Sequence, residues 1–254
     1  MRAAPRFVTL PLAAVAAVGL AAALQTSGHA TPRIVGGTPV STAQYGYAVY
    51  LADRNGFQFC GGTLLTPLKV VTAAHCVVTE KPKNVLVVAG RDDKQSLAGM
   101  VAKVGSIWVN PDFTDVESGD DVAVLTLATR LDYPTATLAT DQDVYRPGTP
   151  STILGWGRVQ ENGPSSRVLR AATVPVVRDT DCAGAYQRFE AASMVCAGYA
   201  RGGVDSCQGD CGGPMLVGPV LVGIASWGDG CARPGKYGVY TRVATYAPLI
   251  RDHL

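Results

Sequence analysis

One imidazole in this chain is suited to catalysis. The histidines are His29, His75 and His253. His29 lies in a segment expected to be removed and His253 is the penultimate residue, so His75 is the candidate base. A neutral hydroxyl or thiol is a poor nucleophile until a nearby base takes its proton. Histidine suits that role because its pKa lies near neutral pH. The residue types favour nucleophilic catalysis around His75, with a purely structural histidine as the alternative.

The number of cysteines is odd, so at least one cysteine has no disulfide partner within the chain. The chain has seven cysteines, so at most six can pair, and the seventh is free or bonded to another molecule. The sequence alone leaves the pairing open. Zinc is the other use of His and Cys together, but the adjacent His75 and Cys76 lack the spaced ligand pairs of zinc sites. Cysteines in an exported chain favour disulfides. We therefore expect no metal and no cofactor.

The first 30 residues have the pattern of a signal peptide. Arg2 and Arg6 give a positive start, an apolar run covers Phe7–Leu24, and small residues precede a cleavage point after Ala30. A membrane anchor is the alternative, but the run is rich in alanine and contains a proline. The pattern predicts a secreted, extracellular protein without a membrane segment after processing.

Charge excludes one class of partner. The whole chain carries a formal net charge of +2. Loss of residues 1–33 removes three of the 22 basic side chains and none of the 20 acidic ones, which leaves −1. Without a basic block, nucleic acid is not an expected partner.

The rest of the chain reads as mostly β-structure. Short runs rich in Val, Thr, Ile and Tyr alternate with clusters of Gly, Pro, Asn and Asp, which is typical of sandwiches and barrels. Only a short segment after Arg178 and the tail from about residue 244 to residue 254 look helical. Residues 131–146 lack a strand pattern and are interpreted as a connector. The predicted strands cover residues 47–51, 85–89, 106–109, 122–127, 152–156, 221–226 and 238–243.

Four segments carry a resemblance to a known family. They occur in the order His, Asp, nucleophile, which is the order in the chymotrypsin class. The segments, in order, are Cys60–Thr63 with Val70–Cys76, then Asp121–Leu125, then Gly209–Pro214, then Ser226–Gly228 with Gly238–Tyr240. Together they resemble the trypsin-like serine peptidases, and the resemblance runs from Ile34 to the C-terminus.

The resemblance implies an all-β fold of two packed antiparallel six-stranded β-barrels with a C-terminal helix. It places a peptidase domain at residues 34–254, with one barrel in residues 34–130 and the other, with the helix, in residues 147–254. Residues 131–146 would connect the two. The short propeptide, residues 31–33, and the small number of disulfides resemble the trypsins of actinobacteria.

The family pattern also assigns roles in a catalytic triad, and these follow a known template. His75 would be the base and Asp121 the residue that holds its tautomer, with the neighbouring Asp120 as the weaker alternative. Cys211 stands at the position of the nucleophilic serine. The backbone N–H groups of Gly209 and Cys211 would form the oxyanion hole.

The same family pattern also assigns residues to substrate recognition. Asp205 would form the floor of the pocket for the residue before the cleaved bond, with Ser226, Gly228 and Gly238 as its walls. A carboxylate there implies cleavage after Arg or Lys. The expected partners are protein or peptide substrates with Arg or Lys and protein protease inhibitors, and a monomer is expected.

The resemblance implies activation by a cut after Arg33. The freed amine of Ile34 would then pair with Asp210, since a buried carboxylate needs such a partner. Three disulfides are implied, which join Cys60 to Cys76, Cys182 to Cys196 and Cys207 to Cys231. Cys211 remains unpaired.

Sulfur at the nucleophile position has two opposing effects. A thiol beside His75 ionises more readily than a hydroxyl. Sulfur is also larger, and misplacing a reacting atom by about 1 Å costs on the order of 10²-fold in rate. We expect acyl-enzyme chemistry with reduced activity. The alternatives are an inert pseudo-peptidase that binds basic peptides or inhibitors, and a redox-sensitive protein that forms intermolecular disulfides.

Overall fold

The computed structural model describes residues 1, 3–4 and 34–254. The predicted signal peptide, apart from residues 1, 3 and 4, and the whole predicted propeptide with Arg33 lie outside the described residues. Within the described part, no helix has the length and apolar character needed to cross a membrane.

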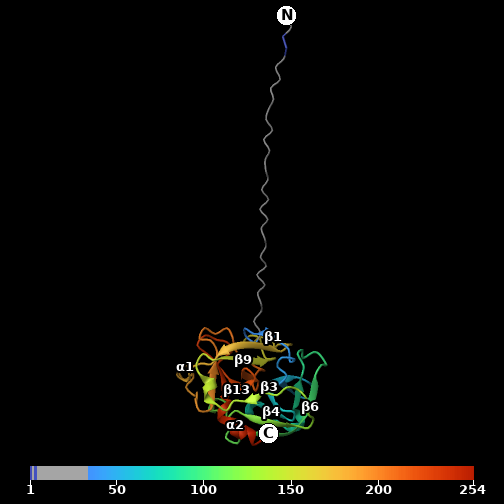
Figure 1. The fold of residues 1–254 in the computed structure, drawn as a ribbon, viewed down its shortest axis with the longest axis vertical. Helices are drawn as coiled ribbons and strands as arrows, with labels where there is room; N and C mark the ends of the chain where they lie inside the picture. The colour runs from blue at the N-terminus through green and yellow to red at the C-terminus, as the bar shows by residue number, and fades with distance from the viewer. Residues whose placement is uncertain (2, 5–33) are drawn as a thin grey trace. The chain divides into compact units, whose positions relative to one another are not determined.

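Six strands form a closed barrel in the first part of the fold. Their order is β2-β3-β4-β7-β6-β5, and every neighbouring pair is antiparallel. Apolar residues of these strands, such as Leu51, Val70 and Leu125, are fully buried in the core. Figure 1 shows β3, β4 and β6 of this barrel. The strands are β2 (Ala48–Ala52), β3 (Gln58–Thr66), β4 (Lys69–Thr72), β5 (Leu86–Ala89), β6 (Met100–Val109) and β7 (Ala123–Leu127).

The second part is a sheet of eight strands among the described residues, in the order β1-β10-β9-β12-β13-β14-β11 with β8 parallel to β13. An isolated bridge between Val176 and Ala197 joins the end of β10 to β11. Six strands, β9 to β14, therefore form a second ring. The strands are β1 (Thr38–Pro39), β8 (Thr137–Leu138), β9 (Pro150–Gly155), β10 (Arg170–Pro175), β11 (Met194–Ala197), β12 (Pro214–Val217), β13 (Val220–Trp227) and β14 (Gly238–Arg242).

Both predicted helices are present. Helix α1 covers Asp179–Ala185 and α2 covers Val243–Arg251, near the C-terminus. The mostly β architecture with a C-terminal helix is thus confirmed. Four short 3₁₀ helices complete the described elements, namely η1 (Ala74–Cys76), η2 (Pro82–Asn84), η3 (Val116–Ser118) and η4 (Gln142–Tyr145).

The two sheets share one apolar core and meet at β3. Leu51 of the first barrel and Ile153 of the second belong to the same buried cluster. The backbone N–H of Gly61 in β3 donates to the carbonyl of Cys211, at 2.7 Å. This hydrogen bond joins the two sheets directly beside the candidate nucleophile. The candidate site therefore lies at the boundary between the two sheets.

Candidate active site

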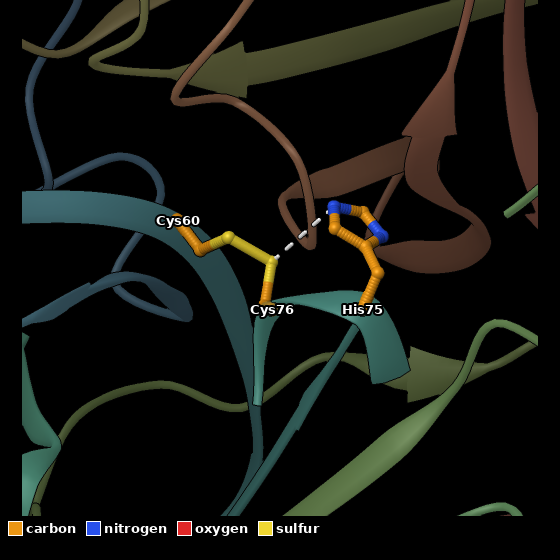
Figure 2. A group of neighbouring side chains, drawn as sticks. All are labelled: Cys60, His75 and Cys76. Atoms are coloured by element: carbon orange, nitrogen blue, oxygen red, sulfur yellow. Dashed lines mark hydrogen bonds between the residues drawn. A yellow bond between two sulfur atoms is a disulfide. The ribbon is translucent and has the colours of Figure 1, made fainter. Parts of the chain in front are cut away.

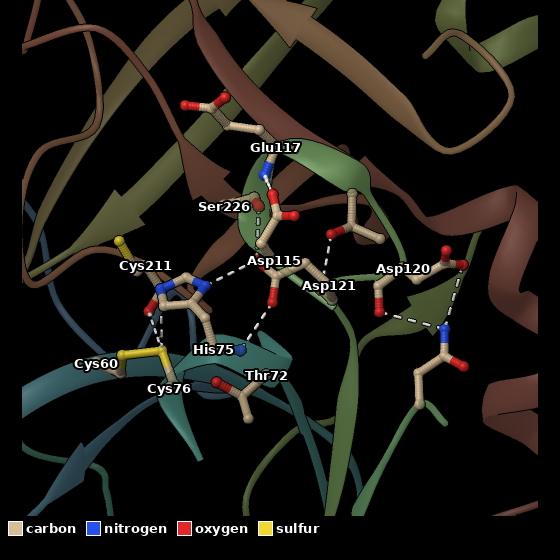
Figure 3. A network of polar contacts seen from close by, with 12 residues as sticks. Cys60, Thr72, His75, Cys76, Asp115, Glu117, Asp120, Asp121, Cys211 and Ser226 are labelled. Carbon is tan, nitrogen blue, oxygen red and sulfur yellow. Dashed lines mark hydrogen bonds and ion pairs between the residues drawn. A yellow bond between two sulfur atoms is a disulfide. The ribbon is translucent and has the colours of Figure 1, made fainter. Parts of the chain in front are cut away.

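Pairing of two neighbouring strands brings His75 and Asp121 together. His75 lies in η1, directly after β4, and Asp121 lies just before β7. Strands β4 and β7 are antiparallel, with Thr72 opposite Ala123. The Nδ1 atom of His75 lies 2.7 Å from Oδ2 of Asp121, and the backbone N–H of His75 donates to Oδ1 at 2.9 Å. The carboxylate therefore holds both the ring and its backbone (Figure 3).

The Asp121 carboxylate is buried and accepts hydrogen bonds from both His75 and Ser226. Its exposed fraction is 1%. Ser226 donates from its hydroxyl to Oδ2 at 2.6 Å, and Thr241 donates to the Asp121 backbone carbonyl at 2.8 Å. The side chain and the backbone of Asp121 are therefore both held in place by hydrogen bonds. The sequence predicted Ser226 as a pocket wall and did not identify its bond to Asp121. No spacing signal could have found it, because the two residues are 105 positions apart.

Asp120 points elsewhere. Its Oδ1 accepts a hydrogen bond from the Tyr246 hydroxyl at 2.8 Å and lies 3.4 Å from the amide nitrogen of Asn110. Asp120 also has a φ of 59°, so its backbone turns sharply before β7. The structure places Asp121, and not Asp120, against His75.

Cys211 is a free thiol on the tight loop that precedes β12. Figure 3 shows its side chain beside the imidazole ring of His75. The next residue, Gly212, has a φ of 79° and donates its N–H to Ala225 at 2.7 Å. A Cβ atom on Gly212 would lie 2.2 Å from Oγ1 of Thr72 and 2.6 Å from the Gly61 carbonyl. Only glycine fits there, and its absence of a side chain lets the loop approach the first barrel.

The surroundings of His75 favour its protonated form. Burial lowers the pKa of His75, but hydrogen bonding to Asp121 and to Cys211, with the negative charge of both, raises it from 6.5 to about 10. These neighbours therefore stabilise the imidazolium form of the ring. A histidine in that state is an acid at the start of the reaction and not a base.

Replacement of the thiol is expected to lower the pKa of His75. In Cys211→Ser the hydrogen bond and the charge that Cys211 contributes to His75 disappear, so the ring loses its proton at a lower pH than in the parent protein. NMR titration of the His75 ring in both proteins measures the difference directly. Equal pKa values would show that Cys211 does not act on the imidazole.

The backbone N–H groups of Gly209 and Cys211 are unused within the part of the chain that the structure describes. The loop around them is held by other bonds. The N–H of Asp210 donates to Cys207 at 2.9 Å and that of Gly213 donates to Asp210 at 2.8 Å. Two free donors on a fixed loop beside a nucleophile have the form of an oxyanion hole.

A pocket of about 160 Å³ opens next to Cys211, and Asp205 is one of the residues that line it. Ser226, Gly228 and Gly238, the predicted walls, line it as well. A Cβ on Gly238 would lie 2.6 Å from Oδ1 of Asp205, so a side chain there would cover the carboxylate. Cys207 and Cys231 also line the pocket, and a disulfide joins them. Asp205 is the one acidic residue among those that line this pocket.

Asp205 is a buried carboxylate with an unsatisfied oxygen. Its Oδ2 accepts from the N–H of Ala232 at 3.0 Å, but Oδ1 has no hydrogen-bond partner among the described residues. Burial raises the pKa of Asp205 from 3.8 to about 7, although hydrogen bonds from the Ala232 and Ser206 backbone lower it in part. An unpartnered buried oxygen is costly unless a ligand supplies a donor.

Binding of a cation in this pocket is expected to weaken in acid. Benzamidine, an aromatic amidinium, needs the ionised carboxylate, and Asp205 takes up a proton as the pH falls through about 7. Its dissociation constant should rise by about tenfold for each pH unit well below 7. Calorimetry between pH 5 and 9 measures this, with neutral benzamide as the matched control. A flat profile for benzamidine would rule out Asp205 as its partner.

Asp210 is buried beside the pocket, with an exposed fraction of 1%. Its carboxylate accepts from the N–H of Gly157 at 2.7 Å and of Cys207 at 3.0 Å. Burial raises its pKa from 3.8 to about 7. Ile34 is fully buried, and the neighbouring Val35 accepts a backbone bond from Asp205 at 3.1 Å. The segment that begins at Ile34 thus lies against Asp205 of the pocket.

Three disulfides are present, in the pairs that the resemblance implies. They join Cys60 to Cys76, Cys182 to Cys196 and Cys207 to Cys231. Cys60, His75 and Cys76 gather three ligand-type atoms within 4.8 Å of one another. Because the two sulfur atoms are bonded to each other, neither is the thiolate that zinc requires. Figure 2 shows the disulfide beside the ring, with Sγ of Cys76 at 3.7 Å from Nε2 of His75.

Comparison with known proteins identifies the family. The two-barrel fold, with a His–Asp pair beside a loop cysteine, is the scaffold of the chymotrypsin class of peptidases. A family model described as Trypsin matches residues 34–250. The trypsin of Saccharopolyspora erythraea is 47% identical over 222 residues, which cover 87% of this chain and 98% of that protein. The trypsin-like protease of Streptomyces glaucescens is 41% identical over 92% of this chain and 89% of its own length. Trypsin eta of Drosophila erecta is 38% identical over 87% of this chain and 90% of its own length. The chain belongs to the trypsin family, a family of serine-type peptidases.

Proposed function

We propose that this protein is an endopeptidase that cleaves after Arg or Lys through an acyl-enzyme, with Cys211 as a slow nucleophile. The single observation that carries the specificity is the unpartnered Oδ1 of buried Asp205 in the lining of the pocket. A guanidinium or ammonium would supply the missing donor and the missing charge. Cleavage next to such a side chain follows because the pocket opens beside Cys211.

The covalent step uses the residues around His75. The sulfur of Cys211 attacks the carbonyl carbon, and its proton resides on His75, which is held by Asp121. His75 gives that proton to the leaving amine as the carbon–nitrogen bond breaks and a thioester forms. Water, deprotonated by His75, then hydrolyses the thioester and restores the thiol. The N–H groups of Gly209 and Cys211 would hold the oxyanion in both halves.

Processing and location complete the proposal. Residues 1–30 would direct secretion, and a cut after Arg33 would free the amine of Ile34. That amine would give the Asp210 carboxylate a directly paired cation in a place where burial raises its pKa to about 7. The expected substrates are proteins and peptides with exposed Arg or Lys, and protein protease inhibitors of matching shape would occupy the same pocket.

Trapping of the acyl-enzyme tests the function directly. The protein cut at Arg33 is mixed with a peptidyl-arginine ester, quenched in acid and examined by intact mass spectrometry. We expect an acyl group on Cys211, and we expect none in His75→Ala. The matched peptidyl-leucine ester should give no adduct. An arginine ester that is bound but never transferred to Cys211 would make the protein a binding scaffold.

A further inference from the structure

Lys94 places a half-buried ammonium among neutral oxygens next to the site. Its Nζ atom lies 2.7 Å from Oε1 of Gln58, 3.2 Å from the carbonyl of Trp156 and 3.4 Å from the hydroxyl of Ser165. An ammonium has three donors, and these three acceptors account for all of them. Burial lowers the pKa of Lys94 to about 8, while the charge of Asp210 raises it in part. The cation therefore lies within electrostatic range of the residue before Cys211.

One chain of hydrogen bonds leads from Lys94 through Gln58 to the loop that carries Cys211. Gln58 is 8% exposed, and its Nε2 donates to the carbonyl of Gly209 at 2.6 Å. The ammonium fixes the orientation of this amide. A flipped amide would direct its NH₂ group at the ammonium and its oxygen at the Gly209 carbonyl, and both contacts would be repulsive. Lys94 thus decides that Gln58 presents a donor to Gly209.

A second chain of hydrogen bonds leads through one peptide group to Asp210. The carbonyl of Trp156 accepts from Lys94, and the N–H of Gly157, on the other side of the same peptide group, donates to Oδ1 of Asp210 at 2.7 Å. A peptide group is planar, so orienting its carbonyl also orients its N–H. The same ammonium therefore bears on the Gly209 carbonyl and on the Asp210 side chain.

The Gly209 carbonyl and the Asp210 side chain, which these two sets of contacts hold, lie in the chain between the two free N–H donors. Gly209 and Cys211 carry those donors, and the chain between them is held by Gln58 at the Gly209 carbonyl and by Gly157 at Asp210. We propose that Lys94, acting through Gln58 and the Trp156–Gly157 peptide, is a positioning residue that aims the oxyanion donors of Gly209 and Cys211. The inference rests on the proposed function, because it assigns those donors to a reaction intermediate.

Two ligands separate this role from a general effect on the fold. Benzamidine occupies only the Asp205 pocket. A peptidyl-arginine aldehyde occupies the pocket and also reacts with Cys211. In that reaction a carbon–sulfur bond forms, the carbonyl π bond breaks, and the thiol proton stays on His75 beside the new alkoxide. The alkoxide is the group that the oxyanion donors would bind, so only the aldehyde reports on them.

The variants are Lys94→Met, which keeps the stem and removes the charge, and Gln58→Glu, which is isosteric and removes the donor to Gly209. Lys83→Met, at an exposed position in η2, is the matched control. We expect both test variants to weaken the aldehyde by about tenfold or more, a fraction of the 10²–10³ attributed to one oxyanion donor. Benzamidine affinity should stay unchanged in all three, which also shows that the fold is intact.

Equal weakening of both ligands, or no change in the aldehyde in either variant, would overturn the positioning role. If Lys94→Met does not fold, Gln58→Glu alone decides between these outcomes. Failure of the proposed function is distinguishable, since the parent protein would then form no covalent adduct with the aldehyde, whether or not it binds benzamidine.

Discussion

Replacement of Cys211 by serine is expected to raise kcat/KM for a peptidyl-arginine amide by on the order of 10²-fold. The loop that carries Cys211 is anchored to the first barrel, because the Gly61 N–H donates to the Cys211 carbonyl at 2.7 Å. On an anchored loop the longer carbon–sulfur bond displaces the reacting atom from the position that an oxygen would occupy. A serine oxygen would also leave His75 with a lower pKa, so that it starts the reaction as a base.

The comparison is made on protein cut at Arg33, with the same concentration of competent sites set by titration with benzamidine. Cys211→Ala is the matched control and should be inert. Treatment with a thiol alkylating agent should abolish the rate of the parent protein and leave Cys211→Ser untouched. A serine variant that is no faster than the parent would show that sulfur is not what limits the rate.

Substitution of Asp205 by serine is expected to remove the preference for Arg and Lys. The pocket would lose its only buried carboxylate, and the bound cation would be left without a partner. Loss of one member of a buried charge pair costs about 2–5 kcal/mol, so kcat/KM for an arginine ester should fall by at least ~30-fold. The rate for the matching leucine ester should stay the same or rise, because the pocket becomes less polar.

The measurement is the ratio of kcat/KM for the two esters in the Cys211→Ser background, where rates are highest. Asp181→Asn, at an exposed position of α1, is the control and should keep the parent ratio. A ratio that is unchanged in Asp205→Ser would place the specificity outside this pocket.

Runs rich in Val, Thr, Ile and Tyr predicted some of the strands and missed others. Strand β7 was predicted almost to the residue, but β3 was not predicted. Its sequence contains Gly61 and Gly62, which weaken a strand pattern. The structure gives a reason for one of them, since a Cβ on Gly61 would lie 2.8 Å from Cα of Gly213. The glycine serves the approach of two sheets, which is a tertiary requirement.

Some residues of the site were also identified from the sequence and others were not. The resemblance assigned His75, Asp121, Cys211 and Asp205 from short motifs, and the structure brings the first three together and Asp205 into the adjoining pocket. Lys94 and Gln58 were not identified from the sequence. Each lies in a segment with no motif, and Gln58 contacts a residue 151 positions away.

The sequence by itself determined which atoms are available, namely one candidate imidazole, one leftover cysteine and an acidic residue in register with the nucleophile. Only the tertiary structure decided how they behave. It placed Asp121 and not Asp120 on His75, added Ser226 from β13, and buried Asp205 with one oxygen free. The reason is that a proton's affinity depends on burial and on neighbouring charges, and both are set by residues that are distant in the chain.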